Sequence, residues 1–97
     1  MLVLITYDVN VTSEGGNRRL RRIAKVCLDH GMRVQYSVFE CEVSPAQFVT
    51  LKSQLLEIFN PNCDSLRFYF LGKKGRTKVE HVGANTVPDP LRDSLIL

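Results

Sequence analysis

The sequence predicts an α/β sandwich, in which one face of a β-sheet carries two helices. Three observations predict this class. Residues 1–8 are an apolar run rich in β-branched side chains, which is typical of a buried strand. Segments 17–30 and 45–59 repeat apolar residues at the spacing of an amphipathic helix. A second strongly apolar run, 65–71, comes after the second of these helices.

The length of the chain sets the scale of the molecule. Its 97 residues are enough for one domain and not two, so we expect a single domain over 1–97 with a C-terminal tail at about 84–97. No apolar run approaches the roughly 20 residues that span a membrane, and residues 1–8 lack the features of a signal peptide. The cysteines Cys27, Cys41 and Cys63 lack C-x-x-C spacing. We therefore expect a cytoplasmic protein with reduced thiols and no membrane partner.

The first strand ends in a carboxylate. Val3, Ile5 and Thr6 are β-branched and the run has no glycine or proline, so we expect a central strand buried on both faces. Asp8 comes where that strand ends. It is either a cap for the following loop or a functional oxygen ligand. In a dimer with Asp8 near the two-fold axis, two carboxylates would meet and would either share a metal ion or repel each other.

The first helix, 17–30, has one apolar face and one basic face. The apolar face consists of Leu20, Ile23, Ala24, Cys27 and Leu28, and the basic face of Arg18, Arg19, Arg21, Arg22 and Lys25. Only Lys25 has an acidic residue at i+4, Asp29, so the alternative of a solvated face laced by ion pairs is less favoured. Arginine forks suit phosphate, and no sequence-reading motif is present. The basic face therefore predicts binding of nucleic acid through its backbone.

The middle of the chain contains one open question and one clear helix start. Residues 33–43 favour extended structure, either as one long bent strand or as two short strands joined near 36–39. Ser44 is then the predicted N-cap of the second helix, with Pro45 at its first position and Gln47 completing a capping box. The segment 60–62, Asn-Pro-Asn, ends that helix.

The final third adds two strands and a tail. Residues 65–71 form a strand, 78–82 alternate weakly like a short edge strand, and 95–97 are apolar. The element order then matches a ferredoxin-like βαββαβ sandwich with both helices on one face. A second copy of the chain would cover the other face.

Several segments together resemble one known family. They are YDV at 7–9, RRLRRIAKVC at 18–27, RVQYSVFEC at 33–41, LRFYFLG at 66–72 and VEHVG at 79–83. They are similar to the CRISPR-associated protein two family, the small universal protein of CRISPR adaptation, and VEHVG is similar to its subtype I-C branch. The resemblance covers nearly the whole chain.

The resemblance implies a homodimer joined sheet to sheet, with an extra C-terminal strand exchanged between subunits. It implies a catalytic metal site at Asp8, where the two copies share one Mg²⁺, with Tyr7, Ser37 and Phe39 as supporting residues. Three arginines, Arg18, Arg22 and Arg33, match basic positions that the family uses for substrate contact. We expect Arg19, on the same basic helix, to contact nucleic acid as well.

Two functions remain open at this point. The first is a scaffold that binds duplex DNA and docks the CRISPR integrase subunit in the spacer-integration complex, with metal-dependent nuclease activity as an additional property. The alternative is primarily an Mg²⁺-dependent endoribonuclease or endodeoxyribonuclease, in which Mg²⁺ polarises the scissile phosphate. The sequence does not choose between RNA and DNA.

Overall fold

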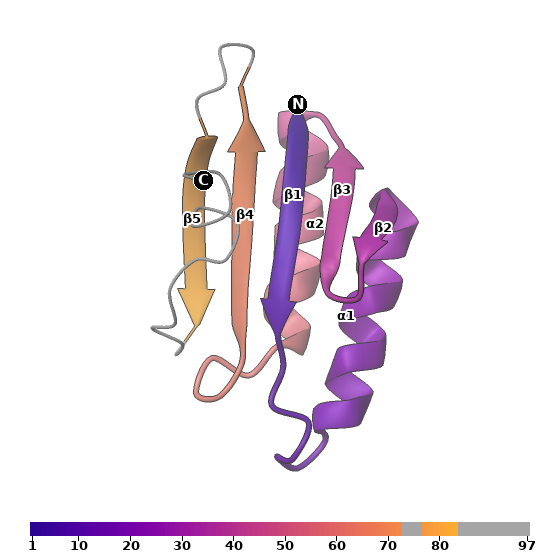
Figure 1. The fold of residues 1–97 in the computed structure, drawn as a ribbon, viewed down its shortest axis with the longest axis vertical. Helices are drawn as coiled ribbons and strands as arrows, with labels where there is room; N and C mark the ends of the chain where they lie inside the picture. Colours follow the sequence, from indigo (N-terminus) through magenta and orange to yellow (C-terminus); the bar gives the residue numbers. More distant parts are fainter. Residues whose placement is uncertain (73–76, 84–97) are drawn as a thin grey trace.

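A computed structural model of the chain describes residues 1–72 and 77–83. Five strands and two helices alternate along these residues (Figure 1). Their bounds are β1 Leu2–Asp8, α1 Gly16–His30, β2 Met32–Gln35, β3 Val38–Glu42, α2 Pro45–Ile58, β4 Ser65–Leu71 and β5 Thr77–Gly83. The predicted tail at 84–97 lies outside the described residues.

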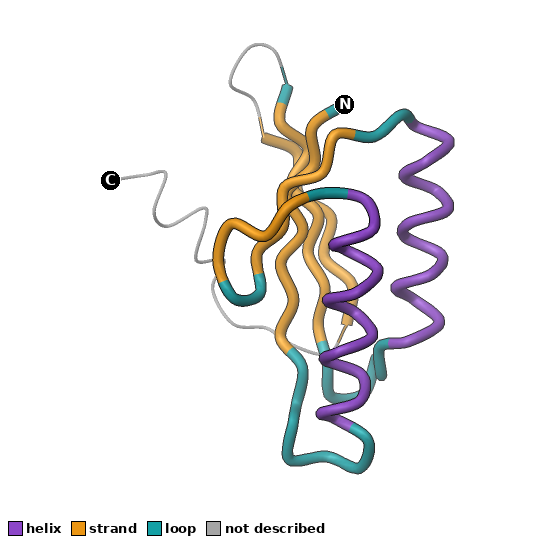
Figure 2. Tube along the Cα trace, turned by 90° about the vertical axis from the view of Figure 1, so that its right-hand side faces the viewer, coloured by secondary structure: helices purple, strands orange, loops and turns teal. Residues whose placement is uncertain are grey.

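The five strands form one antiparallel sheet in the order β2-β3-β1-β4-β5. Both helices lie on one side of it (Figure 2). This confirms the ferredoxin-like prediction: β2, β3, β1 and β4 are the four strands of that fold, and β5 is added at the edge. In this chain β5 pairs with β4 of the same molecule. The exchange of a C-terminal strand between subunits stays a prediction.

The central strand β1 is buried fully on one face only. Val3, Ile5 and Tyr7 lie under the helices and are at most 6% exposed. Leu2, Leu4 and Thr6 point to the opposite face and are half-buried. We call this side of the sheet the helix-free face, because neither α1 nor α2 covers it. The expectation that β1 is buried on both faces was therefore too strong, since the two helices are both on one side.

The open question about residues 33–43 is resolved as two strands. β2 and β3 form a hairpin whose turn consists of Tyr36 and Ser37. Pairing shifts register between Arg33 and Gln35, which marks a bulge in β2 just before the turn. Such a bulge bends and twists the strand locally, which is why the sequence shows no regular alternation through it.

The second helix begins as its sequence predicts. The Gln47 amide donates to the Ser44 hydroxyl at 3.1 Å, and the Gln47 side chain accepts from the Ser44 amide at 2.8 Å. Phe48 on this helix then meets Phe68 and Phe70 of β4 edge to face, with ring centroids 5.3 and 5.0 Å apart. Capping and aromatic packing thus fix α2 against the sheet.

Candidate functional site

A cavity of about 390 Å³ opens at the carboxyl end of β1. Three parts of the fold surround it: the end of β1 with the loop that follows, the second turn of α1, and the β2–β3 hairpin. Its polar and aromatic lining consists of Tyr7, Asp8, Arg21, Arg33, Tyr36 and Ser37. Its apolar lining consists of Val9, Val11, Leu20 and Ala24. Four of the predicted site residues, Tyr7, Asp8, Arg33 and Ser37, therefore meet in one place.

Asp8 is the last residue of β1, and its side chain is exposed at this cavity. Its neighbours in the sheet explain the position. Asp8 pairs with Ser65 of β4, whereas pairing between β1 and β3 stops at Thr6. On the β3 side the sheet therefore ends before Asp8, and the carboxylate is accessible from solvent.

Tyr7 ties the hairpin turn to the end of β1. Its hydroxyl donates to the Tyr36 carbonyl at 3.4 Å, and its amide donates to the Ser37 carbonyl at 3.2 Å. Burial raises the pKa of the Tyr7 hydroxyl, and a hydrogen bond with Arg33 only partly offsets that effect. The hydroxyl therefore stays protonated at neutral pH and remains a donor that positions the turn.

Arg33 and Phe39 support the same corner from the hairpin. Phe39 is 0% exposed and stacks on Tyr7 with ring centroids 6.0 Å apart. The Arg33 guanidinium lies over the Phe39 ring at 5.0 Å from its centroid, while the arginine itself is exposed. This cation–π contact holds the Arg33 side chain beside the cavity. Phe39 thus belongs to the packing under the site, and its ring does not reach solvent.

The basic face of α1 divides into parts with different surroundings. Arg18, Arg21, Arg22 and Lys25 are exposed, and we call these four residues the cationic row. Arg21 lines the cavity, a position that the sequence did not distinguish from those of its neighbours. Lys25 lies 3.7 Å from Asp29, which confirms the one i+4 ion pair that the sequence predicts.

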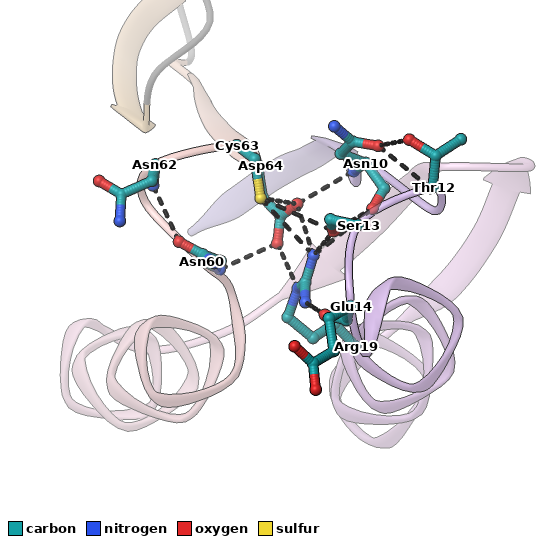
Figure 3. A network of polar contacts seen from close by, with 9 residues as sticks. All are labelled: Asn10, Thr12, Ser13, Glu14, Arg19, Asn60, Asn62, Cys63 and Asp64. Atoms are coloured by element: carbon teal, nitrogen blue, oxygen red, sulfur yellow. Dashed lines mark hydrogen bonds and ion pairs between the residues drawn. The ribbon is translucent and has the colours of Figure 1, made fainter.

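Arg19, by contrast, faces the inside of the fold. Its Nε donates to Oδ2 of Asp64 at 2.7 Å, and its side chain is 13% exposed. The same guanidinium donates to the Glu14 carbonyl at 2.7 Å and to the Ser13 hydroxyl at 2.5 Å (Figure 3). Arg19 therefore has a structural role within the chain, and its predicted contact with nucleic acid stays untested.

Asp64 is the centre of this network, and no pattern in the sequence singles it out. The residue is 0% exposed. Besides the hydrogen bonds from Arg19, its carboxylate accepts hydrogen bonds from the backbone N–H of Asn10 at 3.0 Å and of Asn60 at 2.9 Å (Figure 3). Burial alone would raise the pKa of the carboxyl, but the hydrogen bonds from Arg19, Asn60 and Asn10 outweigh it and lower the pKa. The network joins the loop after β1 to the loop before β4.

This network bears directly on Asp8. Asn10, which Asp64 holds, is only two residues beyond Asp8. Arg19 also contacts the 13–14 end of the same loop, so both halves of the loop are anchored. The direction in which the chain leaves β1 is thus set by residues that are 45 positions apart in sequence.

The donor set limits what metal site one chain could form. Within residues 1–72 and 77–83, no three histidine, cysteine, aspartate or glutamate side chains are grouped so that they could hold a metal ion. Mg²⁺ in proteins often has only one or two carboxylate ligands and fills its remaining positions with water. An exposed Asp8 fits such a site as one carboxylate, and a second carboxylate would come from another copy of the chain.

None of the described helices is both long and apolar enough to cross a membrane.

Sequence comparison places close relatives beside this chain. Residues 1–79 match the family profile described as CRISPR associated protein Cas2. The CRISPR-associated endoribonuclease Cas2 of Chlorobaculum tepidum is 59% identical over 97 residues, which is 100% of both chains. The CRISPR-associated endonuclease Cas2 of Halalkalibacterium halodurans is 53% identical over 96 residues, which is 99% of each chain.

Solved structures agree with the fold. The crystal structure of Streptococcus pyogenes Cas2 matches with a TM-score of 0.70 and 56% identity, over 75% of this chain and 88% of that one. A hypothetical protein from Thermus thermophilus matches with a TM-score of 0.66 and 26% identity, over 91% of this chain and 96% of that one.

Proposed function

This chain belongs to the Cas2 family of CRISPR-associated proteins, and we propose that it acts in CRISPR adaptation as a homodimeric scaffold that binds duplex DNA. Its partner in the spacer-integration complex is the CRISPR integrase subunit. The observation that carries the proposal is the exposed cationic row on α1. Arginines on one exposed helix suit the phosphate backbone, which supplies sequence-independent affinity. A two-fold dimer would double this surface.

Reversing charge in the cationic row tests DNA binding. Arg18→Glu combined with Arg22→Glu should weaken binding to blunt duplex DNA, because repulsion replaces attraction at both positions in each subunit. The slope of the logarithm of affinity against the logarithm of salt concentration should also become less negative, by about 0.9 for each phosphate contact that is lost. Fluorescence anisotropy with labelled duplexes of unrelated sequence, repeated across a salt series, measures both effects.

Two matched variants separate local contact from net charge. Arg18→Lys with Arg22→Lys keeps the charge and should keep the salt dependence. Substituting glutamate at four exposed positions of α2, Ala46, Thr50, Ser53 and Gln54, changes the net charge by the same four units away from the row and should change affinity much less. Equal loss of affinity in the α2 variant, or strong preference of the natural protein for one sequence, contradicts the backbone-contact proposal.

The homodimer part of the proposal is supported by the helix-free face. Leu2, Leu4 and Leu71 are half-buried there, and Val79 is 38% exposed. Leu4 lies between Glu40 and Tyr69 in the pairing of β3, β1 and β4, at the middle of the sheet. A sheet face with an apolar centre is suited to packing against the same face of a second copy.

A charge at the centre of that face should separate the subunits. We expect Leu4→Glu to lower the mass seen by light scattering from dimer to monomer, because each subunit would bring a carboxylate with no cationic partner, directly opposite Glu40 on β3, to the interface. Val49→Glu on α2, where the valine is 67% exposed, is the control and should remain dimeric. Circular dichroism confirms that both variants are folded. A natural protein that is monomeric at micromolar concentration contradicts this proposal.

A second candidate activity is Mg²⁺-dependent hydrolysis of phosphodiester bonds, which the names of the Chlorobaculum and Halalkalibacterium relatives favour. Asp8 is the residue that would hold the ion, together with Asp8 of the second copy. When bound there, Mg²⁺ would polarise the scissile phosphate and supply an activated water. The chain's own contribution is positioning: Arg21 and Arg33 can bind phosphate oxygens at the cavity that Asp8 lines. The proposal covers both RNA and DNA substrates.

A further inference from the structure

The second helix, α2, carries a groove that the proposed DNA contact and the proposed dimer both leave unused. We propose that this groove is a docking site for an α-helix of a protein partner, the integrase subunit, and that the docked helix presents apolar side chains at a spacing of four residues. This inference rests on the proposed function, because it names the surface by which the scaffold would hold its protein partner. The shape of the groove, its polarity and its place in the dimer support it.

The groove lies between two rows of side chains on one helix, and we call it the α2 groove. Its volume is about 490 Å³, and the described residues that line it all belong to α2. They form two rows with a spacing of four, namely Phe48, Lys52 and Leu56 in one row and Val49, Ser53 and Glu57 in the other. When two helices pack, the i±4 ridge of one commonly enters the groove between two such ridges of the other, with the axes crossing at about −50°. The shape of the α2 groove therefore fits a helix.

The α2 groove offers apolar surface on a rigid floor. Val49 is 67% exposed and Leu56 is 38% exposed, so both can lose contact with water when a partner binds. Phe48 is only 9% exposed, and its ring packs edge to face against Phe68 and Phe70 of β4. A helix that covered Val49 and Leu56 would gain hydrophobic free energy, and the floor would lose little conformational freedom.

The charges on α2 favour a protein over nucleic acid as the ligand. Within α2, which the structure describes throughout, Glu57 is the only exposed residue that carries a charge. Lys52 is half-buried, and its ammonium group is already paired with Glu80 of β5. A lone exposed carboxylate repels a phosphate backbone, whereas a scarcity of charge is typical of the core of a protein–protein interface. The helix that fits therefore has a lysine or arginine at one end of its apolar row, where it meets Glu57.

The position of α2 keeps the groove accessible in the proposed dimer. Both helices lie on the side of the sheet that is opposite the helix-free face (Figure 2). A dimer joined through its helix-free faces would turn both copies of α2 outward, and the cationic row belongs to the other helix, α1. A partner helix could then occupy each α2 groove while the dimer and its DNA contact stay intact. The proposed function requires one protein partner, and this surface has the shape and polarity to bind it.

The test measures binding of the purified integrase subunit of the same CRISPR system by isothermal titration calorimetry without DNA. Val49→Glu combined with Leu56→Glu should weaken binding by about a hundredfold or more, because each new carboxylate would be buried against apolar side chains of the partner. Thr50→Glu combined with Gln54→Glu is the matched control. It adds the same charge at exposed positions of α2 outside the groove lining, so it should bind the integrase as the natural protein does.

Two further variants exclude a general effect on folding. Val49→Glu alone changes a side chain that is 67% exposed, so it leaves the core intact and should weaken binding by about tenfold. Val49→Ile combined with Leu56→Met keeps the apolar surface and should keep the affinity. Circular dichroism and light scattering check that every variant is folded and dimeric.

The outcomes separate this inference from the proposed function. If the natural protein and the Val49→Glu, Leu56→Glu variant bind the integrase equally well, the docking site is overturned and the scaffold proposal stands. If the natural protein binds no integrase, the partner in the proposed function is wrong and this inference fails with it. If the same variant loses affinity for blunt duplex DNA, or no longer forms a tetramer that the natural protein forms, the groove binds nucleic acid or a second copy, and the inference is overturned.

Discussion

Asp64→Ala is expected to lower the free energy of unfolding by about 3–5 kcal/mol, the usual cost of removing one partner of a buried ion pair. That is a large fraction of the roughly 5–15 kcal/mol that stabilises a typical domain. The physical reason is that the substitution leaves the Arg19 guanidinium without its carboxylate. It also leaves the Asn10 and Asn60 amides without their acceptor. A urea titration at neutral pH, followed by circular dichroism, measures the loss.

Asp29→Ala is the matched control, since it also removes an aspartate that pairs with a cation of α1. In that pair the side chains of Lys25 and Asp29 are 77% and 59% exposed. We expect a cost of no more than about 0.5 kcal/mol, because exposed helix pairs contribute little. Asp64→Asn, which keeps one acceptor oxygen, should fall between the two. If Asp64→Ala costs no more than Asp29→Ala, the network does not hold the loop.

The same variants predict a pH dependence. The pKa of Asp64 is lower in the folded chain than in the unfolded chain, so its contribution to stability is fully present above the unfolded pKa of about 3.9. That contribution is lost as the pH falls through the lower folded pKa. The free energy of unfolding is measured from pH 6, about two units above the unfolded pKa, to lower pH. Below the unfolded pKa it should decline less steeply in Asp64→Asn than in the natural protein.

Asp8→Asn is expected to reduce any Mg²⁺-dependent cleavage of nucleic acid by more than about a hundredfold. Substituting a residue that only hydrogen-bonds to a metal ligand typically lowers metal affinity or activity 10- to 100-fold. Substituting the ligand itself should cost more, because a neutral amide is a poorer ligand for a hard cation than a carboxylate. The measurement is cleavage of labelled single-stranded RNA, single-stranded DNA and duplex DNA, with Mg²⁺ and with EDTA. Asp29→Asn, an exposed aspartate on α1, should cleave at the natural rate.

Binding should respond differently from cleavage. Asp8→Asn removes two acidic charges per dimer beside a phosphate backbone, so affinity for nucleic acid without divalent ions should be unchanged or higher. If the protein acts as a scaffold, spacer acquisition in cells should survive the substitution. If acquisition stops although the variant still dimerises, binds DNA and binds the integrase, then metal chemistry at Asp8 is the function.

Most of the secondary structure follows from short-range patterns in the sequence. The Ser44–Gln47 capping box, the apolar periodicity of 17–30 and the β-branched run in 1–8 each depend on residues within about one or two helical turns of each other. Local rules of this kind were sufficient for the element order and hence for the ferredoxin-like class. They also placed Asp8 at the end of a strand, where a polar residue is accessible.

The tertiary structure decided which of these residues meet. Arg19 looks like its neighbours in a basic helix, and only the approach of the loop before β4 shows that it pairs with Asp64, 45 residues away. Tyr36 and Arg21 join the cavity at Asp8 because the hairpin turn and the first half of α1 both lie beside the carboxyl end of β1. Such meetings depend on loop paths and on the side of the sheet that each helix covers. Helical and strand periodicity carry no information about either, because periodicity describes one element at a time.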